Sequence, residues 1–192
     1  MPFTFSKTTI EGIKLIQCTE ISDRRGSFWE CFKQSDFTGA GINATFIQSN
    51  CSISQKKVLR GLHFQAAPYQ QGKLVKTLTG AIFDVAVDIR QNSATYGQWF
   101  GTEISAQNKK MLWIPPGFAH GFLTLEDNTL VHYNITGAEY TPSHERSLRW
   151  NDSDIGITWP YQDINLSDKD QQGLSLKEYD SIISQQGIHE DV

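Results

Sequence analysis

The sequence lacks several features that mark particular classes of protein. Its 17 basic and 21 acidic residues give a formal net charge of −4, so it has no basic excess that would neutralise a nucleic-acid backbone. No apolar run approaches the roughly 18 residues of a membrane-spanning helix, and the first ten residues lack the charged and apolar regions of a secretion signal. We therefore expect a cytoplasmic protein that binds neither nucleic acid nor membrane.

Cysteine is also scarce. Cys18, Cys31 and Cys51 are the only three, they are widely spaced, and no two of them form a Cys-x-x-Cys pair. An odd number with this spacing predicts neither a disulfide framework nor a zinc site. We expect all three to be reduced and structural.

What the chain does contain suits one folded unit. Its 192 residues fit a single domain spanning 1–192, and 39% hydrophobic residues, among them 11 Phe and 5 Trp, can fill a core. No repeat, glycine-rich phosphate loop or linker divides the chain, and fraying is expected only from Gln186 onward.

The clearest pattern is an alternation of apolar and polar residues with a period of two. In FDVAVDI, from Phe83 to Ile89, one face carries Phe, Val, Val and Ile while the other carries Asp, Ala and Asp, as in a half-buried strand. Further strands are predicted at 58–65, 73–78, 111–114, 121–125 and 129–135. Many short, evenly spaced strands predict an all-β sandwich, jelly roll or closed barrel.

The turns and helices between these strands are short. Glu-Asp-Asn at 126–128 predicts a hairpin joining the last two strands. A short helix is expected after Ser35, around 36–39, and Ser175 with Glu178 reads as a capping box that opens a C-terminal helix.

Two of the five histidines stand in conspicuous surroundings. His120 follows Pro115 and Gly117 in a Pro-x-Gly-x-x-His pattern that matches the second motif of the cupin superfamily of jelly-roll barrels. The first cupin motif needs His-x-His and a nearby Glu, whereas His63 is followed by Phe and Gln, with no acidic residue before Asp84. Because a metal site needs three or four ligands, we expect no metal here, which leaves both imidazoles available for acid and base chemistry.

Positive charge gathers around the first of these histidines. Arg60 and Lys73 flank His63, and burying this much positive charge is costly unless an anion such as a phosphate ester binds. Strict alternation would send Arg60 and His63 to opposite faces of the strand. A bulge at Gly61 would bring both inward; alternatively, Arg60 faces the rim or a neighbouring subunit.

Two further residues have both a structural and a functional interpretation. Tyr133 lies on the apolar face of its strand, so it is either a buried phenol with a backbone partner or a proton donor across from His63. Ser167-x-x-Asp170 is either a helix cap or the source of a carboxylate that orients an imidazole. Position along the chain leaves both pairs of alternatives open.

Taken together, these motifs resemble the dTDP-4-dehydrorhamnose 3,5-epimerase family, the deoxysugar epimerases within the cupins. The matching segments cover almost the whole chain: 23–26 with Glu30, FIQSN at 46–50, VLRGLHFQ at 58–65, QGKLV at 71–75, FDVAVDIR at 83–90, LWIPPGFAHGF at 112–122, RWND at 149–152 and LSDKD at 166–170.

The resemblance implies a role for each matching residue. It implies that His63 is the base and Asp170 its partner in a dyad. It also implies that Lys73 binds near the sugar ketone and that Tyr133 is the acid. Nucleotide and sugar contacts are implied for Arg25, Glu30, Gln48, Asn50, Arg60, His120, Glu145 and Lys169, with Phe28 and Tyr140 sandwiching the base.

The resemblance further implies a cupin-type jelly roll with short peripheral helices that works as a homodimer. Because the family exchanges N-terminal strands, Arg25, Phe28 and Glu30 are expected to serve the partner's site.

The chain departs from the family pattern at two points. Asn134 stands after Tyr133, where a basic residue is expected, and the stretch 137–139 is one residue longer before Tyr140. The stereochemical outcome depends on this strand, because it places the acid.

The proposed chemistry fits these residues. A hydrogen on C3 or C5 is acidic only because the C4 ketone can hold the resulting charge as an enolate, so the site needs a base of near-neutral pKa and a cation at the ketone oxygen. His63 and Lys73 meet these needs without a metal or redox cofactor. The alternatives are an epimerase acting at one carbon or on a CDP-linked sugar, a metal-dependent cupin enzyme, and a non-catalytic sugar-nucleotide binder.

Overall fold

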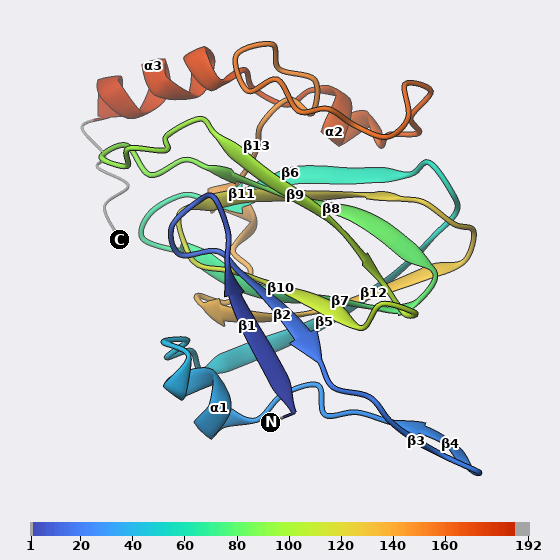
Figure 1. Cartoon of the computed structure of the whole chain (residues 1–192). Coiled ribbons are helices and arrows are strands. Elements are labelled where there is room, and N and C mark those ends of the chain that lie inside the picture. Colours follow the sequence, from blue (N-terminus) through green and yellow to red (C-terminus); the bar gives the residue numbers. More distant parts are fainter. Residues whose placement is uncertain (1, 187–192) are drawn as a thin grey trace.

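The chain folds into two facing β-sheets with a few short helices at the periphery (Figure 1). The computed structural model describes residues 2–186, so the expected fraying beyond Gln186 lies outside the described residues. Within the described part of the chain, no helix is long and apolar enough to cross a membrane.

The six-stranded sheet consists, in spatial order, of β1 (Phe3–Lys7), β2 (Lys14–Cys18), β10 (Lys110–Ile114), β7 (Gln71–Thr79), β12 (Thr129–Gly137) and β5 (Phe46–Ser54). The five-stranded sheet consists of β13 (Glu145–Ser147), β6 (Leu59–Gln65), β11 (Phe118–Thr124), β8 (Ala81–Asp88) and β9 (Trp99–Ser105). All neighbouring strands in both sheets pair antiparallel. The remaining elements are β3 (Ile21–Asp23), β4 (Gly26–Phe28), α1 (Gln34–Gly39), the 3-10 turn η1 (Pro142–His144), α2 (Asp168–Gln171) and α3 (Leu176–Gln186).

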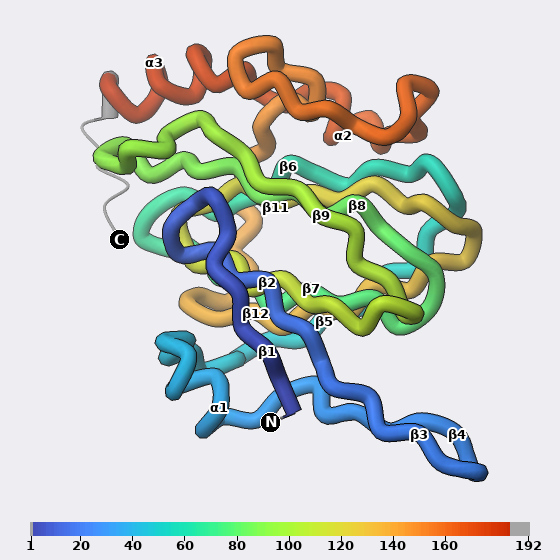
Figure 2. The backbone as a smooth tube through the Cα atoms, in the orientation of Figure 1, coloured from blue at the N-terminus to red at the C-terminus, as the bar shows by residue number. Residues whose placement is uncertain are grey.

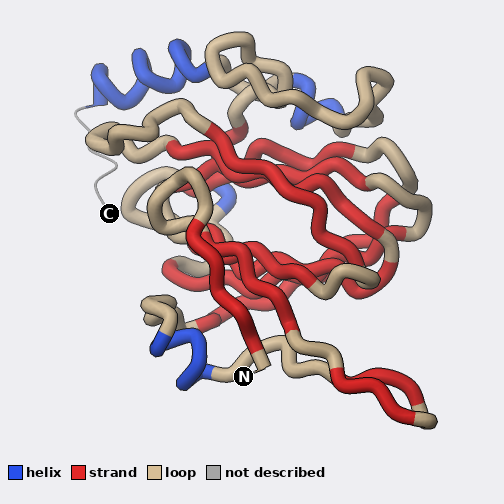
Figure 3. The backbone as a smooth tube through the Cα atoms, viewed as in Figure 1, coloured by secondary structure: helices blue, strands red, loops and turns tan. Residues whose placement is uncertain are grey.

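The hydrophobic core has three layers, because both sheets are covered on their outer faces as well. Val75, Ala86 and Val131 belong to the layer between the sheets. α3 and the segment before it pack on the outer face of the five-stranded sheet, while α1 packs under the six-stranded sheet (Figure 3). The predicted all-β jelly roll with short peripheral helices is therefore confirmed.

The outer layers explain why one strand differs from its prediction. β8 lies where FDVAVDI predicts a strand, but both of its faces are buried rather than one. Val85 and Val87 pack under the C-terminal segment, whereas Ala86 points between the sheets. Asp84 and Asp88 share this inward face and are fully buried, so both need partners inside the protein.

The predicted hairpin at 126–128 is wrong. The strands that it joins exist, but β11 pairs with β6 and β8, and β12 pairs with β5 and β7. From β5 to β8, and again from β9 to β12, each successive strand lies in the opposite sheet. The turn at 126–128 therefore connects the two sheets, and the strands on either side of it do not pair with each other.

Of the two alternatives for Arg60, the structure has the bulge at Gly61. On β11 only one residue separates His120 from Phe122, while two separate their partners His63 and Arg60 on β6. Gly61 has φ of 134°, and a Cβ there would lie 2.5 Å from the backbone of Gly121. Only glycine fits this crossing, and the extra residue turns Arg60 to the same face as His63.

A two-stranded arm, β3 and β4, projects from the body of the molecule (Figure 2). Its base is held by Lys109, which pairs with Glu20 at 2.8 Å and lies 5.0 Å from the centre of the Trp29 ring. Along the arm the large apolar side chains of Ile21 and Phe28 are 65% and 63% exposed.

Candidate active site

A cavity of about 250 Å³ collects half of the predicted site residues. Its walls come from both sheets and from the segment after β12. The lining residues are Gln48, Asn50, His63, Phe64, Gln65, Gln71, Lys73, Tyr133, Ile135, Tyr140 and Glu145.

His63 meets a carboxylate at the edge of this cavity. Its Nε2 lies 2.5 Å from Oδ1 of Asp170, which α2 supplies from more than 100 residues along the chain. Because one ring nitrogen faces the carboxylate, the other is left to exchange a proton with a bound molecule. The pair has the arrangement of a general base and the group that orients it.

Asp170 is fixed as a carboxylate. Burial tends to raise its pKa, but hydrogen bonds from His63, Ser167 and the backbone N–H of Gly61 lower the pKa below its usual value. The backbone N–H of Asp170 donates to Ser167 Oγ at 3.2 Å, so the serine caps α2. The two interpretations of Ser167-x-x-Asp170 are therefore compatible. The Ser167 hydroxyl caps the helix, and the Asp170 carboxylate contacts the imidazole.

Lys73 supplies a partly buried cation at the cavity wall. Its ammonium donates to the backbone oxygen of His63 at 3.3 Å. Burial lowers the pKa of Lys73 from 10.5 to about 8, although the carboxylates of Asp84 and Glu145 oppose this shift. The ammonium is therefore mostly charged at neutral pH and loses its charge as the pH rises through 8.

Tyr133 opens onto the same cavity from β12. Burial raises the pKa of its hydroxyl, and this outweighs the hydrogen bond with Asn50 and the positive charge of Arg60, which lower it. The phenol is therefore protonated at neutral pH. Asn134, where the chain departs from the family pattern, does not line the cavity because its side chain points to the other face of the strand.

The segment that carries Tyr140 is held in place by glutamines. Gln48 accepts a hydrogen bond from the backbone N–H of Tyr140 at 3.2 Å, and Gln71 donates to Ala138 O at 2.8 Å. Gln65, which is 4% exposed, donates to Glu139 O at 3.3 Å and accepts from the N–H of the following Thr141 at 2.6 Å. The stretch that is one residue longer than the family pattern is thus tied to three strands.

Charged groups surround the hydroxyl of Tyr140. It donates to Glu145 Oε2 at 2.7 Å, and Lys169 forms an ion pair with the same carboxylate. Burial tends to raise the pKa of Glu145, but Lys169 and Tyr140 lower it overall. Lys169 therefore stands beside the cavity, although it does not line it.

His120 lies behind the cavity wall and is 5% exposed. Its Nε2 is 2.7 Å from Oδ1 of the fully buried Asp84. Burial lowers the pKa of His120 more than the nearby Asp84 raises it. Arg60 does not line the cavity either, and its Nε donates to Ser54 Oγ at 3.0 Å.

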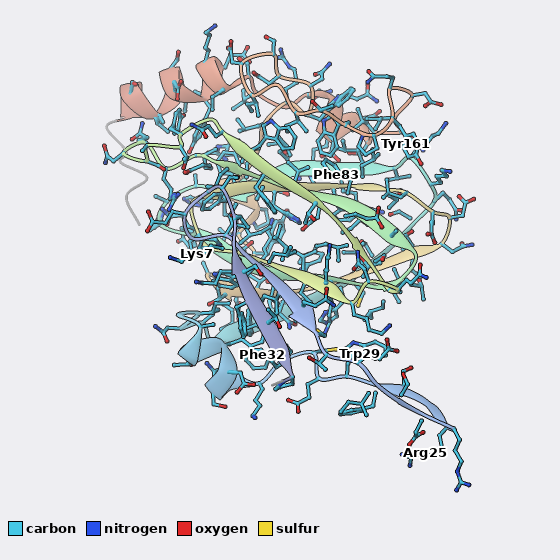
Figure 4. The ribbon with its side chains drawn as sticks, in the orientation of Figure 1. Lys7, Arg25, Trp29, Phe32, Phe83 and Tyr161 are labelled. Carbon is cyan, nitrogen blue, oxygen red and sulfur yellow. The ribbon has the colours of Figure 1, made fainter. Side chains whose placement is uncertain are left out.

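The residues predicted on the arm are not at this cavity. Arg25 sits at the tip of the arm, where it points away from the body and pairs with Asp23 at 2.6 Å (Figure 4). Neither Phe28 nor Glu30 lines the cavity of its own subunit.

Several residues at the site were missed in the sequence. Gln65 follows His63 by two residues and Gln71 precedes Lys73 by two, so the alternation of strands already placed each glutamine on the face of a predicted site residue. Asp84 carried no such signal, because its partner His120 lies on another strand.

Each of the two imidazoles contacts one carboxylate, Asp170 for His63 and Asp84 for His120. In the described part of the chain, no group of three or more His, Cys, Asp or Glu side chains could hold a metal ion. That the protein needs no cofactor stays a prediction.

Comparisons with known proteins point in one direction. A family model described as dTDP-4-dehydrorhamnose 3,5-epimerase matches residues 7–178. A protein of that name from Methanothermobacter thermautotrophicus is 45% identical over 179 residues, which cover 92% of this chain and 96% of the relative. Another from Shigella flexneri is 47% identical over 178 residues, covering 92% and 98%.

A solved structure is similar in fold as well as in sequence. The dTDP-6-deoxy-D-glucose-3,5-epimerase of Legionella pneumophila Philadelphia 1, in complex with dTDP-4-keto-L-rhamnose, superposes with a TM-score of 0.89 at 42% identity. The match covers 94% of this chain and 96% of that one.

Proposed function

The chain belongs to the dTDP-4-dehydrorhamnose 3,5-epimerase family, and on that premise we propose that it inverts C3 and C5 of a dTDP-4-keto-6-deoxyhexose. The observation that carries the proposal is the 2.5 Å contact between His63 and Asp170 at a cavity also lined by Lys73 and Tyr133. This combination offers a base, a cation and a proton donor around one bound ring.

In the proposed reaction His63 removes the proton next to the ketone. Asp170 orients the imidazole and stabilises the imidazolium that forms. The Lys73 ammonium faces the C4 oxygen and stabilises the enolate, because a fixed cation in a site shielded from water favours the charge that develops. Tyr133 returns a proton to the opposite face, and repeating the sequence at the second carbon completes the double inversion.

The remaining site residues are proposed to hold the substrate. We assign Tyr140 to stack on the base, and Glu145 and Lys169 to fix that tyrosine and the neighbouring hydroxyls. Contacts with the sugar and the phosphates are assigned to Gln48, Asn50 and Arg60, whereas His120, behind the cavity wall, is assigned no direct contact. The positive charge of Arg60 and Lys169 suits a diphosphate.

Incubation in deuterium oxide tests this function. With a dTDP-linked 4-keto-6-deoxyglucose, NMR should show deuterium at both C3 and C5 together with the doubly inverted product. The CDP-linked sugar is the matched control and should react much more slowly. Exchange at a single carbon would indicate a mono-epimerase, and binding of the sugar without exchange would indicate a non-catalytic binder.

We also propose a homodimer in which each arm reaches the partner's cavity. The support is that Arg25, Phe28 and Glu30 lie outside the cavity of their own subunit, while Phe28 and Ile21 expose large apolar side chains. A partner subunit would cover this apolar surface and bring a second aromatic ring towards Tyr140.

A mixed dimer tests whether the arm acts across subunits. The variants Arg25→Ala and His63→Ala should each be impaired, yet co-refolding them in equal amounts should restore about one quarter of wild-type activity. In a mixed dimer, one cavity would combine an intact His63 with the intact arm of the other subunit. If the arm served its own subunit, mixing would restore nothing.

The cytoplasmic location and the absence of a required metal or redox cofactor are part of the same proposal. Each step above is a proton transfer, which the side chains of the cavity can perform by themselves.

A further inference from the structure

Asp84 is a buried carboxylate that the proposed mechanism does not use. It projects from β8 into the interior and is fully buried. One oxygen, Oδ1, lies 2.7 Å from His120 Nε2. The other, Oδ2, is buried and has no hydrogen-bond partner among the described residues. An unpaired buried carboxylate oxygen is costly and calls for a physical explanation.

The surroundings of Asp84 suggest what this oxygen does. Its charge acts on the Lys73 ammonium, which enters the interior from the opposite sheet. On the two strands next to β7, the residues paired with Lys73 are Ile114 of β10 and Ile135 of β12. Neither side chain can compensate a positive charge.

The charged and titratable groups around this ammonium come from several elements. They are Asp84 on β8, His120 on β11, His63 on β6, Glu145 on β13 and Tyr133 on β12. Of the two carboxylates that act on Lys73, Glu145 is already paired with Lys169. Within residues 2–186, Asp84 forms no ion pair with a lysine or arginine.

We propose that Asp84 is a positioning residue for this reaction, whose carboxylate orients the His120 ring and keeps the Lys73 ammonium charged at the cavity wall. The inference rests on the proposed function, because in that function the charge on Lys73 stabilises the enolate. Asp84 itself does not line the cavity, so it acts only through these two side chains.

The pH profile of kcat/KM tests the proposal, because it reports the ionisation of groups in the free enzyme. In the wild type, kcat/KM should fall as the pH rises through about 8, where Lys73 loses its proton. In Lys73→Arg this alkaline fall should disappear, because a guanidinium stays charged. This first pair of measurements tests the role of Lys73 independently of Asp84.

The variant Asp84→Asn should move the alkaline fall to lower pH by roughly one unit, because an opposite charge nearby favours the charged form of Lys73. In the Lys73→Arg background the same substitution should move nothing. Asp88→Asn is the matched control, since Asp88 is equally buried on the same face of β8 but pairs with Arg90 at 2.7 Å. An unshifted profile in a folded Asp84→Asn enzyme, or an equal shift in Asp88→Asn, would overturn the proposal and leave the epimerase assignment intact.

Stability provides a second test if Asp84→Asn alone folds poorly. The double variant Asp84→Asn/Lys73→Met removes both charges, so it should melt at a higher temperature than Asp84→Asn, which leaves the ammonium uncompensated. Circular dichroism would measure both transitions. A double variant that melts at the same temperature as Asp84→Asn, or lower, would show that the two charges are not coupled.

Discussion

Replacing His63 with Ala should reduce solvent deuterium incorporation at both C3 and C5 by about 10²–10⁴-fold. Both exchanges should fall together, because His63 is the one imidazole among the residues that line the cavity, and Asp170 orients it. The measurement is the rate of deuterium uptake by NMR on the dTDP-linked 4-keto sugar. Binding of the nucleotide should persist, since the groups assigned to the base and the phosphates are unchanged.

His132→Ala is a suitable control for this variant. His132 neighbours Tyr133 on β12 but faces the other side of the sheet, where its Nε2 lies 2.9 Å from Ser49 Oγ. The loss of this imidazole should leave exchange unchanged. Undiminished exchange in His63→Ala would remove His63 from the role of base.

Tyr133→Phe should separate proton removal from inversion. His63 remains able to form the enolate, so deuterium should still enter, but the proton returns from the original face. Formation of the inverted product should therefore fall by about 10²–10⁴-fold, the usual contribution of a positioned acid, while exchange falls much less. Measuring both quantities in one NMR time course gives the ratio directly.

The raised pKa of Tyr133 makes this separation a sharp test, because the phenol carries its proton at neutral pH and has one to deliver. Tyr161→Phe, which removes a hydroxyl outside the cavity, should change neither quantity. Exchange and inversion falling by the same factor in Tyr133→Phe would mean that the tyrosine acts before the enolate forms, and its role as the returning acid would be wrong.

Local sequence patterns predicted the strands and the faces of their side chains. The alternation along 129–135 placed Tyr133 inward, and the glycine at 61 indicated, as one of two alternatives, the bulge that aligns Arg60 with His63. Such patterns succeed because the pleat of a strand fixes the direction of each side chain whatever the strand pairs with.

The same patterns failed where the answer depended on pairing. The residues at 126–128 have the chemistry of a hairpin turn, yet the strands on either side join different sheets. The half-buried pattern of FDVAVDI became a strand buried on both faces, because α3 and the preceding segment cover its outer side. A turn motif does not determine which strands, distant in sequence, the two flanking segments will pair with.

By itself, the sequence determined the all-β class, the positions of the main strands, and the face of the strand at 129–135 that carries Tyr133. Only the tertiary structure decided that Asp170 of α2 meets His63, that Lys169 meets Glu145, and that Asp84 pairs with His120 across neighbouring strands. The reason is physical: alternation is a local property of the backbone, whereas these contacts join residues far apart in sequence. They form only because burying apolar surface between two sheets and beneath the C-terminal segment brings those residues together.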